Sequence, residues 1–150
     1  MSEKILLTGI SGWIAKHTAI ELLNSGYEVL GTVRNKNLIE QTKETISKYA
    51  SIEKLSFVEL DLVKDEGWNE AAKGCKYIFH IASPFPMKVS RNRESLLPPA
   101  VDGTLRVLKA GVNAGVEQII KTSSIVAMFR KPNRSNPYTV SYTHLRAHET

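Results

Sequence analysis

Apolar residues along this chain form short runs that alternate with stretches of helical spacing. The runs cover residues 5–7, 27–33, 55–60, 77–81 and 118–122, which is the length and composition of buried strands. Between them, apolar positions recur every three or four residues over 12–23, 37–50, 68–72 and 100–113, as on one face of a helix. Strands that alternate with helices in this way predict an α/β fold with a parallel sheet.

The junction between the first strand and the first helix contains Thr8-Gly9-Ile10-Ser11-Gly12. Gly9 permits a tight turn, and Gly12 lets a ligand approach the backbone without meeting a Cβ atom. Ala15 stands where a third glycine is common, and its methyl group is small enough for close helix–strand packing. A strand, a glycine turn and a helix in this order aim free N–H groups at a phosphate. We therefore interpret the segment as a phosphate-binding loop in preference to an ordinary turn.

The spacing Thr-Gly-x-x-Gly-x-x-Ala resembles the extended short-chain dehydrogenase/reductase superfamily, which includes the NAD-dependent epimerases and dehydratases. It is most similar to the branch of dihydroflavonol reductases and aldehyde/ketone reductases. The resemblance implies a Rossmann-like, doubly wound parallel sheet with strand order 3-2-1-4-5, truncated after the fifth strand. It also implies that the loop residues contact a dinucleotide cofactor, namely Gly9, Ser11, Gly12, Trp13 and Ile14.

The end of the second predicted strand indicates which dinucleotide binds. A site for NAD usually has Asp or Glu here to hold the ribose 2′-hydroxyl, whereas this chain has Arg34-Asn35-Lys36. Thr32, Arg34 and Lys36 offer donors and positive charge, which suit a 2′-phosphate. The sequence thus predicts NADP (NADPH), with Arg34 and Lys36 as ligands.

Asp61-Leu62 follows the third predicted strand directly. In the resembling family, this Asp accepts a hydrogen bond from the adenine amino group and the next residue packs on the ring. The alternative for Asp61 is a loop carboxylate or a helix cap. We expect Asp65 to be the cap, with Glu66 in the first turn, which leaves Asp61 free.

The segment His80-Ile81-Ala82-Ser83-Pro84 follows the fourth strand and resembles the family pattern His-x-Ala-(Ser/Thr)-Pro. Small residues at this point let a dinucleotide cross the sheet edge, so Ile81, Ala82 and Ser83 are assigned to the cofactor site. His80 could act as a base, but we interpret it as a hydrogen-bonded core residue because it lies on a buried strand.

The longest predicted helix precedes the fifth strand. Its expected apolar face consists of Leu97, Val101, Leu105, Leu108 and Val112. The fifth strand then ends in Thr122-Ser123-Ser124. Resembling reductases carry their catalytic serine in this Ser-Ser pair, which assigns catalysis to Ser124 and places Thr122 beside the cofactor. A serine hydroxyl can donate a hydrogen bond to a substrate carbonyl oxygen as negative charge develops there.

Residues 140–150 differ in character from the rest of the chain. A DNA sequence that encodes these residues can be chosen so that it looks like a transposon-end sequencing adapter read in one frame. We therefore expect a non-native tail and exclude it when predicting the fold. Residues 1–139 are then an incomplete dinucleotide-binding domain. The family's Tyr-x-x-x-Lys pair would lie beyond it. Tyr142 and Arg146 imitate that pair, but they lie too close to Ser124, and Arg does not replace Lys.

Composition narrows the possible partners. The net charge of +5 comes from scattered basic residues without interleaved aromatic residues, so we expect no nucleic-acid partner. No apolar run is long enough to span a membrane and no signal peptide is visible, while the single cysteine, Cys75, fits a reducing compartment. We therefore expect a cytoplasmic protein without a metal site, because no Cys, His and carboxylate cluster has ligand spacing. The sequence leaves the oligomeric state open.

These observations predict that the parent protein is an NADP-dependent oxidoreductase. It would transfer a hydride between NADPH and a small carbonyl compound or secondary alcohol, whereas this fragment would be inactive. Two alternatives remain. One is a nucleotide-sugar epimerase or dehydratase, which Arg34 argues against. The other is a non-catalytic dinucleotide-binding sensor.

Overall fold

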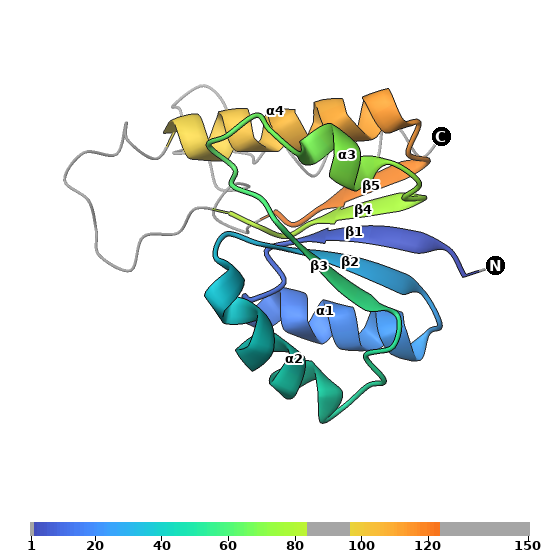
Figure 1. Cartoon of the computed structure of the whole chain (residues 1–150). Helices are drawn as coiled ribbons and strands as arrows, with labels where there is room; N and C mark the ends of the chain where they lie inside the picture. The colour runs from blue at the N-terminus through green and yellow to red at the C-terminus, as the bar shows by residue number, and fades with distance from the viewer. Residues whose placement is uncertain (1, 84–96, 124–150) are drawn as a thin grey trace, which may run out of the picture.

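The computed structural model describes residues 2–83 and 97–123, which form a parallel sheet between two layers of helices (Figure 1). The strands are β1 (Lys4–Thr8), β2 (Glu28–Val33), β3 (Leu55–Glu59), β4 (Tyr77–His80) and β5 (Gln118–Lys121). Helices α1 (Trp13–Asn24) and α2 (Ile39–Ser47) cover one face, and α3 (Trp68–Ala72) and α4 (Leu97–Ala114) cover the other. The spatial order β3-β2-β1-β4-β5 confirms the predicted fold class and strand order.

The central strand β1 contributes side chains to two hydrophobic cores, one on each face of the sheet. Ile5 and Leu7 point to the layer of α1 and α2, whereas Leu6 points to the layer of α3 and α4. All three side chains are at most 1% exposed, because β1 pairs with β2 on one side and β4 on the other. A strand covered on both faces must be apolar at successive positions, which is the pattern of its sequence.

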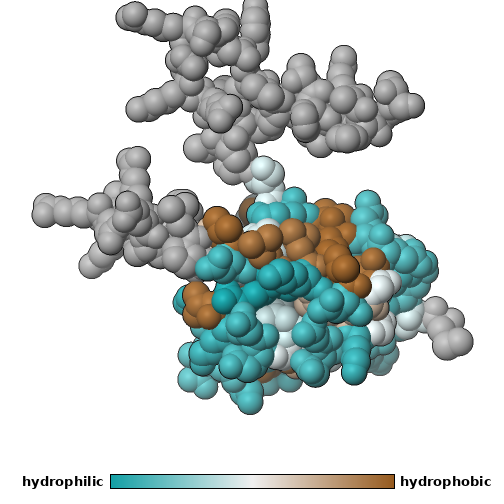
Figure 2. Space-filling view, turned by 90° about the horizontal axis from the view of Figure 1, so that it is seen from above, coloured by the Kyte–Doolittle hydropathy of each residue, from teal (hydrophilic) through white to brown (hydrophobic). Residues whose placement is uncertain are grey.

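Helix α4 packs on the sheet through a different face from the one predicted. Val101, Leu105, Leu108 and Val112 are 51%, 46%, 36% and 77% exposed, and the side chain of Leu97 lies outside the described residues. Figure 2 shows apolar surface over this helix. The buried face has smaller residues, such as Val107, Ala110 and Gly111. A Cβ atom on Gly111 would lie 2.5 Å from Ile119 Cδ1, so glycine permits the close approach.

The predicted cap of the third helix was also wrong. The N-cap of α3 is Gly67, with φ of 83° and no side-chain hydrogen bond. The Asp65 carboxylate instead forms an ion pair with Arg106 of α4. The competing partner lies 41 residues away in the sequence, so the local pattern could not indicate it.

Cys75 is buried after α3, and its Sγ donates to the carbonyl of Ala71 at 3.3 Å. Burial raises the pKa of this thiol, which keeps it in the unreactive protonated form. Among the described residues, no helix has both the length and the apolar character needed to cross a membrane.

Candidate functional site

The glycine turn after β1 has the geometry of an anion-binding loop. Gly9 has φ of 70°, and the N–H of Gly12 donates to the Gly9 carbonyl at 2.9 Å, which closes the turn. Gly12 then begins α1 in an extended conformation, and no side chain caps the helix. The N–H groups of the first helical turn are therefore left for a ligand, and the positive end of the helix dipole favours an anion there.

Thr32 of β2, which the sequence suggested as a phosphate donor, supports this loop. Its hydroxyl oxygen accepts a hydrogen bond from the Gly9 N–H at 3.0 Å, and the residue is only 3% exposed. The adjacent Ile10 N–H donates to the Thr32 carbonyl at 3.0 Å. The strand thus holds the loop through both its backbone and its side chain.

Two glycines let neighbouring segments meet at this edge of the sheet. A Cβ atom on Gly9 would lie 3.0 Å from the Cβ of Ala82, just after β4. A Cβ atom on Gly31 would lie 2.5 Å from Ile10 Cδ1, so the fully buried Ile10 packs directly over the β2 backbone. Glycine at both positions is thus required by close contact, and at Gly9 also by the positive φ.

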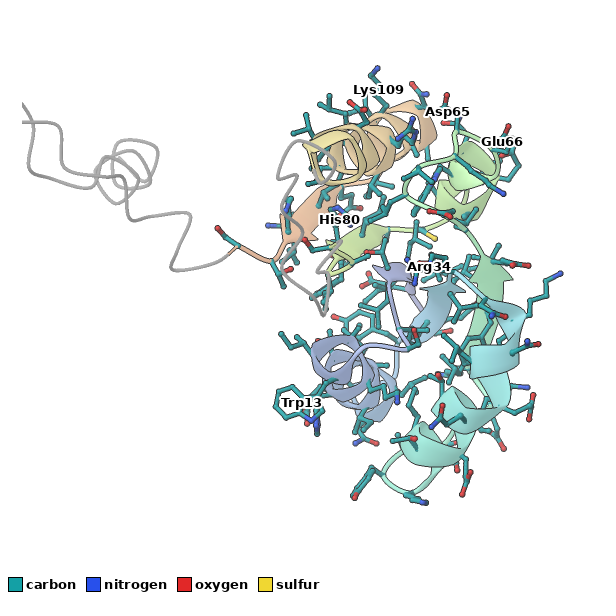
Figure 3. The ribbon with its side chains drawn as sticks, turned by 90° about the vertical axis from the view of Figure 1, so that its left-hand side faces the viewer. Trp13, Arg34, Asp65, Glu66, His80 and Lys109 are labelled. Atoms are coloured by element: carbon teal, nitrogen blue, oxygen red, sulfur yellow. The ribbon has the colours of Figure 1, made fainter. Side chains whose placement is uncertain are left out.

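A cleft of about 640 Å³ opens where the carboxyl ends of β1, β2, β3 and β4 meet. Figure 3 views the molecule from this end. The residues that the sequence predicted as cofactor ligands line the cleft with two exceptions. Those that line it are Gly9, Ser11, Gly12, Trp13, Ile14, Arg34, Asp61, Leu62, Ile81, Ala82 and Ser83, and Ala15 and Thr32 line it as well. The exceptions are Lys36 and Thr122. The structure thus brings together segments spread over 75 positions of sequence.

Arg34 and Lys36 differ in their surroundings. Arg34 is exposed and lines the cleft, and no described residue accepts a hydrogen bond from its guanidinium or pairs with it. Lys36 lies in the short 3₁₀ turn η1 (Lys36–Leu38), and its ammonium group is 3.6 Å from the Glu59 carboxylate. An anion in the cleft would therefore meet an unpaired Arg34, whereas Lys36 is already paired.

Asp61 lines the same cleft from the end of β3, the strand next to β2. One oxygen of its carboxylate accepts a hydrogen bond from the Val63 N–H at 3.1 Å, which leaves the other oxygen for a ligand. Leu62 is partly buried beside it. The hydrogen bond to Val63 is a contact within the loop, so Asp61 is partly the loop carboxylate that the sequence left as an alternative.

His80 is a core residue, as interpreted from the sequence. It is 1% exposed, and its Nδ1 is 2.9 Å from the hydroxyl of Thr8. That hydroxyl also accepts hydrogen bonds from the N–H groups of Ile81 and Ala82, at 3.1 and 3.0 Å. Burial lowers the pKa of His80 to about 4, with a smaller contribution from the positive charge of Lys121. His80 is therefore neutral at pH 7 and supports the cleft from behind.

The last predicted site residues come after β5. The N–H and hydroxyl of Thr122 approach the His80 carbonyl at 3.1 and 3.4 Å, outside the cleft lining. Ser124 and the predicted tail, residues 140–150, lie outside the described residues. The roles of Thr122 and Ser124 stay predictions.

Four further residues line the cleft and were not predicted from the sequence, namely Leu38, Leu60, Val63 and Trp68. Val63 directly follows Asp61-Leu62, so its position next to two predicted ligands could have indicated that it lines the cleft. No pattern in the sequence indicated that Trp68 lines the cleft, because it belongs to α3 and not to a loop at the end of a strand. Within the described part of the chain, no three His, Cys, Asp or Glu residues are grouped so that they could hold a metal ion.

Comparison with known proteins agrees with this geometry. Residues 5–149 match the model of the NAD dependent epimerase/dehydratase family. The chain belongs to this family. It is 35% identical over 121 residues to dihydroflavonol 4-reductase of Hordeum vulgare, a match that covers 80% of this chain and 34% of the relative. It is 37% identical over 138 residues to cinnamoyl-CoA reductase 1 of Petunia hybrida, covering 92% and 40% of the two chains.

Solved structures give the same picture. Yeast methylglyoxal/isovaleraldehyde reductase complexed with NADPH is similar with a TM-score of 0.73 and 29% identity, over 84% of this chain and 38% of that one. Vestitone reductase from alfalfa (Medicago sativa) is similar with a TM-score of 0.67 and 31% identity, over 98% and 46%. The chain therefore spans less than half the length of these relatives, all of which are reductases by name.

Proposed function

We propose that this chain is the cofactor-binding part of an NADP-dependent oxidoreductase that acts on a small carbonyl compound or secondary alcohol. The observation that carries the proposal is the cleft itself, which is lined both by the uncapped N-terminus of α1 and by Arg34, a side chain with no partner among the described residues. The reduced nicotinamide supplies a hydride when it is bound. The structural relative solved with NADPH supports the choice of cofactor.

Each part of the cleft has a role in this proposal. The first turn of α1, with Ser11 and Gly12, holds the pyrophosphate, and Arg34 pairs with the ribose 2′-phosphate. The free carboxylate oxygen of Asp61 accepts from the adenine amino group, with Leu62 beside the ring. Ile81, Ala82 and Ser83 pass under the dinucleotide on the way to the nicotinamide. Ser124 would then donate to the carbonyl oxygen of the substrate.

Catalysis requires more than these residues. Reduction of a carbonyl adds a hydride to carbon and a proton to oxygen, and residues 1–139 contain no proposed donor for that proton. General acid catalysis contributes typically about 10² to 10⁴ in rate. We therefore expect the 150-residue chain to bind NADPH without turnover, and a chain extended to the length of its relatives to be active.

The test is NADPH consumption with a panel of small aldehydes and ketones, measured for both chains. Oxidation of NADPH by the longer chain alone is the expected result. Binding without turnover by the longer chain would favour the sensor, and conversion of nucleotide sugars would favour the epimerase or dehydratase. Turnover by the short chain that is lost in Tyr142→Phe would contradict the assignment of a missing tyrosine.

A further inference from the structure

The loop that leaves β3 forms one wall of the cleft but has little backbone support. The N–H of Leu60 donates to the Val33 carbonyl at 2.9 Å, which is the last backbone bond from the loop to β2. Beyond it, Asp61, Leu62 and Val63 line the cleft. Since β3 is the edge strand among the described residues, none of the five described strands covers the loop on its other side. Apart from the Lys64 N–H, which donates to the Asp61 carbonyl within the loop at 3.1 Å, its further support comes from side chains.

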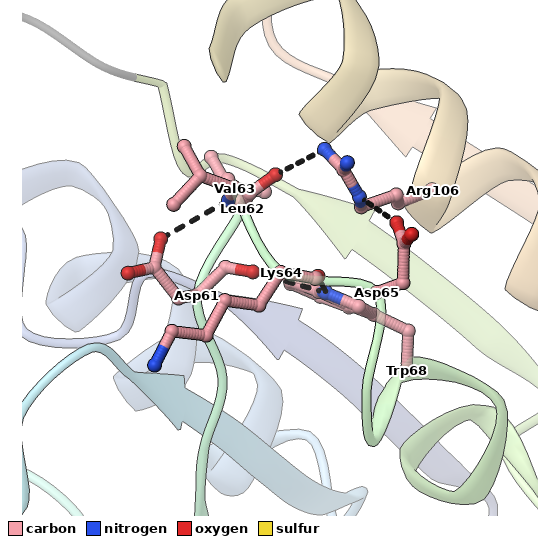
Figure 4. A network of polar contacts seen from close by, with 7 residues as sticks. All are labelled: Asp61, Leu62, Val63, Lys64, Asp65, Trp68 and Arg106. Carbon is pink, nitrogen blue, oxygen red and sulfur yellow. Dashed lines mark hydrogen bonds and ion pairs between the residues drawn. The ribbon is translucent and has the colours of Figure 1, made fainter.

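Those side chains belong to α3 and α4 (Figure 4). The indole N–H of Trp68 is within hydrogen-bond distance of the carbonyls of Asp61, at 3.2 Å, and Lys64, at 3.0 Å. Nη1 of Arg106 donates to the carbonyl of Leu62 at 2.7 Å, and its Nε donates to the Asp65 carboxylate. Three carbonyl groups of the loop are thus bound by only two side chains.

Arg106 is held more firmly than a surface ion pair would suggest. Its side chain is 22% exposed, whereas that of Asp65 is 83% exposed. One turn earlier in α4, Gly103 brings the helix against the loop, because a Cβ atom there would lie 2.8 Å from the Cβ of Leu62. The planar guanidinium offers donors in a fixed geometry, so it can donate to the Leu62 carbonyl and the Asp65 carboxylate at the same time.

We propose that Arg106 is a positioning residue for the adenosine end of the cofactor, because it holds the Asp61–Leu62 loop at the distance that the adenine requires. The inference rests on the proposed function. Arg106 acts through the Leu62 carbonyl and is not among the residues that line the cleft. Its loss would free the wall formed by Asp61 and Leu62 while the glycine loop on β1 keeps its own hydrogen bonds from Thr32.

The test compares two probes on the chain, adenosine 2′,5′-bisphosphate and inorganic pyrophosphate. The first needs the adenine wall and the second needs only the glycine loop. The variants are Arg106→Met and Arg106→Lys, and the control is Lys109→Met, which removes a positive charge from the exposed side of the same helix. Affinity is measured by calorimetry, and the thermal midpoint of each variant is recorded.

We expect Arg106→Met to weaken binding of the adenosine bisphosphate about tenfold, the scale of a lost charge-assisted hydrogen bond, with pyrophosphate binding unchanged. Arg106→Lys should lose most of this affinity too, since one ammonium group cannot reproduce both contacts. Unchanged affinity in both Arg106 variants, or an equal loss for both probes, would overturn the inference alone. A wild-type chain that binds neither probe would overturn the proposed function and this inference with it.

Discussion

Acidification should destabilise this protein through His80. The Thr8 hydroxyl accepts hydrogen bonds from the N–H groups of Ile81 and Ala82, so its own proton must point to Nδ1 of His80. His80 is then neutral, with its proton on Nε2, which is 3.5 Å from the hydroxyl of Thr104. A second proton on Nδ1 would place two donors against each other. Protonation is therefore opposed both by burial and by this contact.

The size of the effect follows from the two pKa values. In the unfolded chain, His80 has its ordinary pKa of 6.5, whereas burial lowers it to about 4 in the folded protein. Between these values the unfolded state binds a proton that the folded state does not. Stability is therefore fully present above pH 6.5 and is lost as the pH falls toward 4. The loss is up to about 1.4 kcal/mol per pH unit and about 3 kcal/mol in total.

The assay is urea unfolding at pH 7.5, 6.5, 5.5 and 4.5, followed by circular dichroism. Because carboxylates also titrate in this range, the relevant quantity is the difference in slope between wild type and His80→Asn, which keeps an acceptor for Thr8. His17→Gln, on the exposed surface of α1, is the control. The slope should decrease in His80→Asn and not in His17→Gln. Equal slopes in wild type and His80→Asn, or an NMR titration of His80 near pH 6.5, would refute the reasoning.

Three further predictions concern other parts of the chain. Gly31→Ala should lower the free energy of unfolding by about 1–3 kcal/mol, because its methyl group would lie 2.5 Å from Ile10 Cδ1, and urea unfolding measures this; an unchanged midpoint would contradict it. Arg34→Asp should make NADH the better-bound cofactor, whereas Lys109→Asp should leave the order unchanged in the same binding assay; NADPH preference retained by Arg34→Asp would exclude Arg34 as the phosphate ligand. Deletion of residues 140–150 should leave the thermal midpoint unchanged. The family match runs on to residue 149, so this deletion tests directly whether the predicted tail is non-native. A drop of several degrees would show that the tail belongs to the fold.

The alternation of strands and helices and the position of the phosphate-binding loop could be predicted from short-range patterns, whereas the resemblance to a known family supplied the strand order and the roles of several cleft residues. A glycine turn between a buried strand and a helix fixes where phosphate can bind. The carboxyl ends of parallel strands then bring Arg34, Asp61 and Ala82 to the same edge of the sheet. None of these steps requires knowledge of a contact between distant side chains.

The predictions that were wrong depended on such contacts. The buried face of α4 was missed because glycine and alanine allow the helix to approach Ile119 and Ile78 closely, while larger apolar residues point outward. Hydrophobic periodicity gives weight to large residues, so it selected the exposed side. Asp65 was assigned to a cap because its partner, Arg106, belongs to a helix that lies far along the chain. The hydrogen bond between the Gly9 N–H and the Thr32 hydroxyl was not predicted either, because it joins residues 23 positions apart.

The measurement that tests the central claim most directly is a titration of the chain with NADPH and with NADH. Trp13 and Trp68 both line the cleft, so bound reduced nicotinamide should emit light when tryptophan is excited. We predict saturable binding, with NADPH bound about tenfold more tightly than NADH or better, since a charge-assisted phosphate contact contributes roughly 1.5–3 kcal/mol. Equal affinities for the two cofactors, or binding of neither, would contradict the account.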